Sequence, residues 1–360
     1  MRTRPTISCL LLTVLVASCG ALAQDARQPD PKRPETPREA PASAYDSLPD
    51  VAKKMIESAE KGADGSFTSL AGIETRGTGP VHVVLIPGLA SDWTVWEAFM
   101  RRNGERYTMH AVTLPGIGES RAPAMPSPDE KLWSDDVWLL NAERALVAGI
   151  DGLKLSGPPV VMGHSMGGHL ALRLAERHPE KVSSAVMVDG YAAWPLSGGT
   201  VIPIEGRRTM VDNQLTSWFD AAIAAHDGAG LKRMFVTGTI NEGRGQVLAE
   251  MAMKTPAQVT KRYMMELCAA DLTPGLKTLE RPVLVLAAIP PAPTTPAPAA
   301  ADAPAPIDPR DVARETWRTQ FAGADRVTLE FIEGSRHFVM DDQPGALDTL
   351  LAAFVEKLSR

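Results

Sequence analysis

One short stretch near the middle of the chain, residues 158–168, constrains the fold more than any other. It reads PPVVMGHSMGG, so an apolar run leads directly into the pattern G-x-S-x-G at Gly163–Gly167. Apolar residues then recur at helical spacing between His169 and His178, which predicts a helix. A strand, this glycine pattern and a helix in succession predict a sharp turn that lifts Ser165 above the end of the strand.

The two glycines of the pattern have a steric purpose. Side chains two positions before and after Ser165 would collide across so tight a turn, and Gly163 and Gly167 have no side chain. The turn also places the serine at the N-terminus of the following helix, where the helix dipole amounts to about half a unit of positive charge. Because that charge favours a negative oxygen nearby, the stretch predicts a serine that acts as a nucleophile.

The composition is typical of a globular protein and excludes several classes of partner. The chain has 360 residues, of which 44% are hydrophobic and 22% are charged, and its formal net charge is −6. It has no basic run that would predict nucleic-acid binding, and no CxxC or HExxH pattern that would predict a metal site. We therefore expect no nucleic-acid partner, no metal and no cofactor.

The N-terminus predicts export from the cytoplasm. Basic residues precede an apolar run, and Ala21-Leu22-Ala23 resembles a cleavage site, so residues 1–23 are interpreted as a signal peptide. Residues 16–19, VASC, also resemble a lipobox, and cleavage there would leave a lipidated Cys19. The alternatives are a soluble periplasmic or secreted protein and an outer-membrane lipoprotein. Membrane contact is expected only in the second case. Cys268, the one cysteine beyond this segment, is interpreted as a small buried residue.

The rest of the chain predicts a linker and one α/β domain. Residues 24–45 are rich in proline and charge, which predicts a disordered linker before a folded domain at 46–360. Residues 65–79 alternate in hydrophobicity and predict an antiparallel hairpin. Nearly continuous apolar runs, each a predicted strand, then alternate with helical patterns; besides the run before Gly163 they lie at 81–86, 107–113, 182–188, 281–288 and 327–332. This alternation predicts a mostly parallel, doubly wound sheet with helices on both faces.

Two segments interrupt the alternation at the carboxyl ends of the strands, where binding sites of such sheets lie. Residues 191–270, which follow the strand ending at Asp189, are helical in pattern and rich in Trp, Phe and Met. They predict a helical cap that gives a pocket an apolar lining. Residues 289–309 are a Pro/Ala-rich run that predicts an extended loop at the same end of the sheet.

Several motifs now appear in a familiar order. They are Leu85-Ile86-Pro87-Gly88-Leu89, Leu114-Pro115-Gly116-Ile117-Gly118, Gly163-His164-Ser165-Met166-Gly167 and Ser335-Arg336-His337-Phe338. Together they resemble the α/β-hydrolase superfamily over residues 65–358. The resemblance implies a serine hydrolase with Ser165 as nucleophile and His337, in the loop after the last strand, as its base. It also implies an oxyanion hole formed by the backbone N–H groups of Leu89 and Met166.

The third member of a catalytic triad, a carboxylate, has three candidates. The resemblance implies a position just after strand 283–288, but the chain reads Ile289-Pro290-Pro291 there. Asp302 and Asp308 lie beyond the Pro/Ala run, and Asp308 before Pro309 also predicts a helix N-cap. Asp189 ends the strand that follows the serine's helix, where some members of the superfamily carry their acid. Asp189 is the preferred candidate, and the other two remain open.

These features predict a hydrolase that cleaves carboxylic esters of small apolar acyl groups through an acyl-enzyme at Ser165. A lactonase, thioesterase, amidase or perhydrolase with the same triad is an alternative within the enzymes. A non-catalytic ligand-binding homologue is the alternative outside them, supported by the absent carboxylate after strand 283–288. The sequence does not indicate an oligomeric state.

Overall fold

The computed structural model describes residues 69–120, 136–195, 202, 204–224, 228–292 and 308–358. The predicted signal peptide, the predicted linker and Asp302 lie outside these residues, as does most of the Pro/Ala-rich run. In the described part of the chain, no helix combines the length and the apolar character that a membrane crossing requires.

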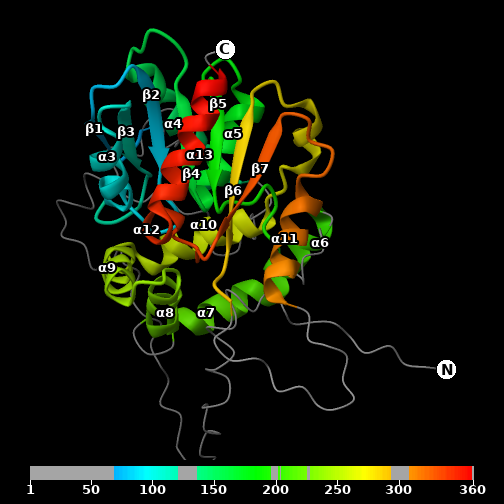
Figure 1. The fold of residues 1–360 in the computed structure, drawn as a ribbon. Coiled ribbons are helices and arrows are strands. Elements are labelled where there is room, and N and C mark those ends of the chain that lie inside the picture. Colours follow the sequence, from blue (N-terminus) through cyan, green and yellow to red (C-terminus); the bar gives the residue numbers. More distant parts are fainter. Residues whose placement is uncertain are drawn as a thin grey trace, which may run out of the picture.

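The described strands form one seven-stranded sheet in the order β1-β3-β2-β4-β5-β6-β7 (Figure 1). Only β1 runs antiparallel to its neighbour, β3, and the other neighbouring pairs are parallel. The mostly parallel sheet predicted from the sequence is therefore confirmed. The strands are β1 (Gly72–Arg76), β2 (Val81–Ile86), β3 (Tyr107–Thr113), β4 (Val160–His164), β5 (Ser184–Val188), β6 (Val283–Ile289) and β7 (Val327–Glu333).

The predicted hairpin within residues 65–79 is wrong in its pairing. The described part of that segment holds a single strand, β1, which pairs with β3 so that Gly72 lies opposite Thr113. The alternating burial of β1 fits an edge strand with one solvated face. Alternation predicts such a strand but does not identify its partner, which is decided by the packing of the whole sheet.

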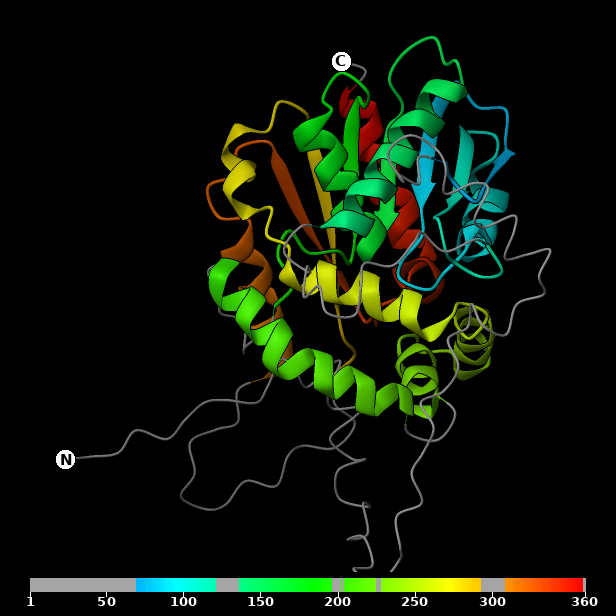
Figure 2. The same cartoon turned by 180° about the vertical axis from the view of Figure 1, so that it is seen from behind.

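Helices cover both faces of the sheet, as the continuous burial of β4 and β5 requires. Helices α3 and α13 lie on the face turned to the viewer in Figure 1, and α4 and α5 lie on the opposite face, seen in Figure 2. The helices outside the later insertion are η1 (Trp93–Trp96), α3 (Glu97–Asn103), α4 (Val137–Gly152), α5 (Met166–Arg177), η5 (Thr273–Thr278), α11 (Pro309–Gln320), α12 (Val339–Asp342) and α13 (Pro344–Leu358).

A helical insertion between β5 and β6 lies at the carboxyl ends of the strands, below the sheet in Figure 1. It comprises α6 (Ile204–Met210), the π-helical turn η3 (Val211–Leu215), α7 (Thr216–Ala224), α8 (Ala229–Thr237), α9 (Glu242–Ala252) and α10 (Ala257–Ala269). We refer to these helices as the cap. Their position agrees with the predicted interruption of the α/β alternation.

Helix α10, yellow in Figure 2, fixes the cap to the sheet domain through buried polar contacts. The hydroxyl of Tyr263 donates to the carbonyl of Pro115 at 3.0 Å. The carboxylate of Glu266 accepts the N–H groups of Trp138 and Leu139, both at 2.9 Å, and so caps the N-terminus of α4. Burial raises the pKa of Glu266 to about 7, against the opposing effect of the nearby Arg262 guanidinium. These bonds place α10 over the strand ends that carry the candidate site.

Candidate active site

Ser165 occupies the sharp turn between β4 and α5 in a strained backbone conformation. Its φ is +55° and its ψ is −118°, a combination that side-chain-bearing residues rarely adopt and that costs about 1–3 kcal/mol. A Cβ at Gly163 would lie 1.9 Å from the carbonyl oxygen of Gly167, and one at Gly167 would lie 2.3 Å from that of Ile86. The predicted collision across the turn therefore holds for Gly163, whereas a side chain at Gly167 is excluded by the end of the neighbouring strand β2.

His337 and Asp189 are directly hydrogen bonded, although 148 residues separate them in sequence. The imidazole Nδ1 lies 2.6 Å from Oδ2 of Asp189. Since a carboxylate only accepts, Nδ1 carries a proton in this bond, which leaves Nε2 as the nitrogen that can accept one. His337 comes from the loop between β7 and α12, and Asp189 directly follows β5 with a left-handed φ of +48°.

The end of β6, where the resemblance placed a carboxylate, contributes a backbone donor instead. The N–H of Ala288 donates to Oδ1 of Asp189 at 3.1 Å, so both oxygens of this carboxylate are occupied. Asp308 lies elsewhere: it caps α11 by accepting the N–H of Arg310 at 2.9 Å, as its position before Pro309 predicts. Of the three candidate acids, Asp189 is the one that contacts His337 in the described structure.

The two predicted oxyanion donors have no backbone acceptor in the described structure: the N–H of Leu89 lies in the loop after β2, and that of Met166 lies in the first turn of α5, where N–H groups have no intrahelical partner. Leu89 lies in a tight turn closed by the N–H of Ser91, which donates to the carbonyl of Gly88 at 3.2 Å. The hydroxyl of Ser91 also donates to the carbonyl of Leu89 at 3.3 Å. Gly88 lets this turn come close, because a Cβ there would lie 3.2 Å from the Cβ of Ser165.

His164, the residue before the serine, was not assigned a role from the sequence. Its Nε2 donates to the main-chain carbonyl of His337 at 2.9 Å, and the two ring centroids are 4.6 Å apart. Burial, together with the nearby His337, lowers the pKa of His164 well below its ordinary value. Its ring therefore stays neutral and supports the loop that carries His337. Its place inside the glycine pattern was the only signal that the sequence offered.

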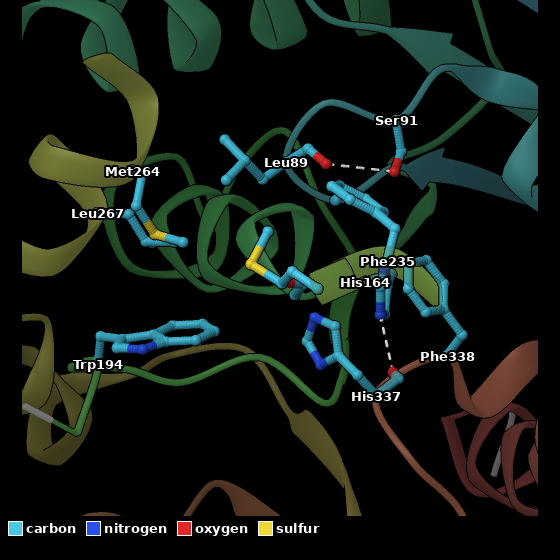
Figure 3. A pocket seen from close by; sticks show the side chains of 12 residues that line it. Leu89, Ser91, His164, Trp194, Phe235, Met264, Leu267, His337 and Phe338 are labelled. Atoms are coloured by element: carbon cyan, nitrogen blue, oxygen red, sulfur yellow. Dashed lines mark hydrogen bonds between the residues drawn. The ribbon is translucent and has the colours of Figure 1, made fainter. Parts of the chain in front are cut away.

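Ser165 and His337 line one pocket between the strand ends and the cap (Figure 3). The pocket holds about 450 Å³ of space that protein atoms leave free, its open mouth included. None of its lining residues is an Asp, Glu, Lys or Arg. The apolar part of the lining consists of Leu89, Trp194, Met234, Phe235, Met264, Leu267 and Phe338.

Other reactive side chains are placed differently. In the described part of the chain, no group of three or more His, Cys, Asp or Glu residues could hold a metal ion. Cys268 is buried as the sequence predicts, and burial raises the pKa of its thiol to about 12. A thiol that stays protonated is a poor nucleophile, which leaves Ser165 as the nucleophile candidate in this region.

Comparison with known proteins places the chain among related sequences and folds. The chain is 28% identical over 229 residues to a pimeloyl-[acyl-carrier protein] methyl ester esterase from Nitrosomonas europaea, an alignment that covers 59% of this chain and 78% of that protein. Its fold matches MenH from S. aureus with a TM-score of 0.59 at 13% identity, over 80% of this chain and 99% of that one.

A thermophilic esterase from Thermogutta terrifontis matches with a TM-score of 0.56 at 19% identity, over 81% of this chain and 98% of that one. At such identities these two structures support the fold alone. The sequence profile of one family, by contrast, matches residues 83–348, which is most of the chain. The protein is a member of the alpha/beta hydrolase family.

Proposed function

We propose that the protein is a serine hydrolase that cleaves carboxylic esters through an acyl-enzyme at Ser165. The observation that carries the proposal is the 2.6 Å bond between His337 Nδ1 and Asp189 Oδ2, formed at the edge of a pocket that also contains Ser165. This bond selects the tautomer whose Nε2 can accept a proton from the serine hydroxyl. Asp189 then stabilises the imidazolium that forms.

The proposed reaction uses protein groups and water. Ser165 Oγ attacks the acyl carbon while its proton moves to His337, and the imidazolium returns that proton to the departing alkoxide. Water then attacks the acyl-enzyme with His337 again as base, which releases the carboxylic acid and restores the serine. The free N–H groups of Leu89 and Met166 are proposed as donors to the oxyanion, each worth about 3 kcal/mol of barrier.

The lining of the pocket favours an uncharged, apolar acyl group. It contains no Asp, Glu, Lys or Arg side chain, so a charged acyl chain would lose hydration without gaining an ion pair. Trp194, Met264 and Leu267 offer apolar surface instead. The names of the related esterases support ester cleavage as the reaction.

A fluorophosphonate probe tests the proposal, since it labels a serine only where a base and an oxyanion site activate it. We expect the wild-type protein to be labelled and to hydrolyse p-nitrophenyl esters, and we expect Ser165→Ala to do neither. Thioester, lactone and amide substrates of matched acyl length would rank the alternative activities. A folded wild-type protein that is neither labelled nor active on any of these substrates would refute the proposal that it is a serine hydrolase and would favour a ligand-binding role.

We also propose that the protein is exported, because residues 1–23 have the pattern of a signal peptide. The intact mass of the mature protein separates the two routes. Cleavage after Ala23 gives an unmodified chain, whereas cleavage before Cys19 gives a chain with added acyl mass. Recovery of the full-length chain from the cytoplasmic fraction alone would exclude both.

A further inference from the structure

The loop that carries His337 is bonded to the cap on both sides of this histidine. The N–H of Phe338 donates to the carbonyl of Gly238 at 3.0 Å. On the other side, Nη1 of Arg336 donates to the carbonyl of Thr239 at 2.9 Å. Both acceptors belong to residues 238–241, which connect α8 to α9 and which we call the cap turn.

One carboxylate joins the two segments. Oδ1 of Asp342 accepts the hydroxyl of Thr239 at 2.6 Å and the N–H of Ile240 at 2.8 Å, both from the cap turn. Oδ2 of the same residue accepts the N–H of Arg336 at 2.8 Å, the residue directly before His337. Thr239 is fully buried, so its hydroxyl has no alternative partner in water.

The cap turn is also continuous with the wall of the pocket. It directly follows α8, which contributes Met234 and Phe235 to the lining. The ring of Phe338 packs close to this segment, since its centroid lies 6.1 Å from that of Phe235 and a Cβ at Gly238 would lie 2.9 Å from its edge. The surface that an acyl group would contact and the loop that holds His337 are therefore in direct contact.

We propose that Asp342 is a positioning residue that fixes the His337 loop to the cap turn and thereby aligns the imidazole at the pocket. The inference rests on the proposed function, because it assigns a role in the alignment of that base. Asp342 does not act on substrate: in the described structure its carboxylate bonds the cap turn and Arg336, and it bonds neither Ser165 nor Asp189.

The adjacent residue offers a matched control. Asp341 lies on the same short helix, α12, and its carboxylate also reaches the cap, through a 3.0 Å ion pair with Arg244 of α9. Its side chain makes no bond to the backbone of residues 336–338 within the described structure. Asp341→Asn therefore weakens a cap contact without releasing the His337 loop.

The experiment compares Asp342→Ala, Thr239→Val and Asp341→Asn on esters of short and long acyl chain. Thermal unfolding first confirms that each variant is folded at the assay temperature. We expect Asp342→Ala to lower kcat about ten- to a hundredfold with KM within about threefold, since a misplacement of about 1 Å has an effect of this size. Thr239→Val, which removes the hydroxyl but keeps the shape, should lower kcat in the same direction by less, and Asp341→Asn should leave kcat within about threefold of wild type.

The rate at which a fluorophosphonate labels Ser165 should fall in parallel with kcat, because labelling needs the same base. An unchanged kcat in both Asp342→Ala and Thr239→Val would overturn the inference, as would an equal loss in Asp341→Asn. If Asp342→Ala does not fold, the inference is tested by kcat of Thr239→Val: a value no lower than that of Asp341→Asn would overturn it. Failure of the proposed function looks different, because the wild-type protein itself would then be neither labelled nor active.

Discussion

The side chain of His164 donates its Nε2–H to the main-chain carbonyl of His337 at 2.9 Å, so one histidine supports the peptide of another. On its opposite edge, Nδ1 of His164 lies where a Cβ of Gly88 would approach within 2.8 Å. His164 thus separates the Leu89 turn from the His337 loop at a fixed distance. It supports the His337 loop from the sheet side, while Asp342 does so from the cap side.

Replacement of His164 should therefore affect turnover more than binding. His164→Leu leaves the carbonyl of His337 without this donor, so the loop can shift, and we expect kcat to fall at least about tenfold, since a misplacement of about 1 Å can cost about a hundredfold. His164→Gln, whose amide can supply the same donor, should recover most of that loss. Steady-state kinetics on one ester check both variants, and an equal loss in the two would show that volume, not the hydrogen bond, is what matters.

Asp189→Asn should lower kcat by about a thousandfold or more, because an amide facing Nδ1 favours the tautomer whose Nε2 is already protonated. Asp308→Asn serves as the control, since that carboxylate caps α11 and pairs with Arg310 away from the pocket. We expect the control to keep its activity and to lose only some thermal stability. A loss of less than tenfold in Asp189→Asn would remove this residue from the proposed triad.

Acid should destabilise the protein through His169. This residue is buried in α5, where its Nδ1 donates to the carbonyl of Tyr191 at 3.0 Å. Burial, together with the charge of Arg173, lowers its pKa from 6.5 to about 3. The pKa is depressed in the folded state, so below pH 6.5 the unfolded chain binds a proton that the folded chain does not.

The unfolding free energy should therefore fall by up to about 1.4 kcal/mol per pH unit from this residue as the pH drops from 6.5 towards 3. In His169→Asn, the side-chain amide can donate to the carbonyl of Tyr191 in place of Nδ1, and the variant has no group at this position that titrates between pH 3 and 6.5. Urea unfolding of both proteins at several pH values measures the difference in slope. The prediction would be contradicted if the unfolding free energies of wild type and variant changed equally with pH between 6.5 and 3.

Substitution of a glycine in the serine turn by alanine should destabilise the fold, whereas the same substitution at a glycine with free space around it should not. Gly163→Ala places a Cβ 1.9 Å from a main-chain oxygen, and we expect a loss of about 3 kcal/mol or more in the free energy of unfolding. Gly152 ends α4 with nothing within 4 Å of such a Cβ. Gly152→Ala should be neutral or stabilise the fold by about 0.5–1 kcal/mol. Denaturant melts test the pair, and a well-folded Gly163→Ala of wild-type stability would show that the turn can relax.

Much of the sheet follows from local patterns. The predicted strands at 81–86 and 107–113 match β2 and β3 residue for residue, because continuous apolar runs bounded by turn residues leave little choice. The predicted hairpin was wrong because hydrophobic alternation within a segment does not show which strand lies beside it: the described part of the segment holds one strand, β1, and its partner β3 lies further along the chain.

The sequence by itself determined the alternation of strands and helices, the serine turn with its two obligatory glycines, and the family to which the chain belongs. These features depend on residues close in sequence, where sterics and periodicity act directly. Only the tertiary structure decided that Asp189 meets His337, that Ala288 supplies a backbone N–H where a carboxylate was expected, and that His164 and Asp342 hold the His337 loop. Each of these contacts joins the ends of different strands or a strand end to the cap, and such contacts arise only once the sheet order and the cap are assembled.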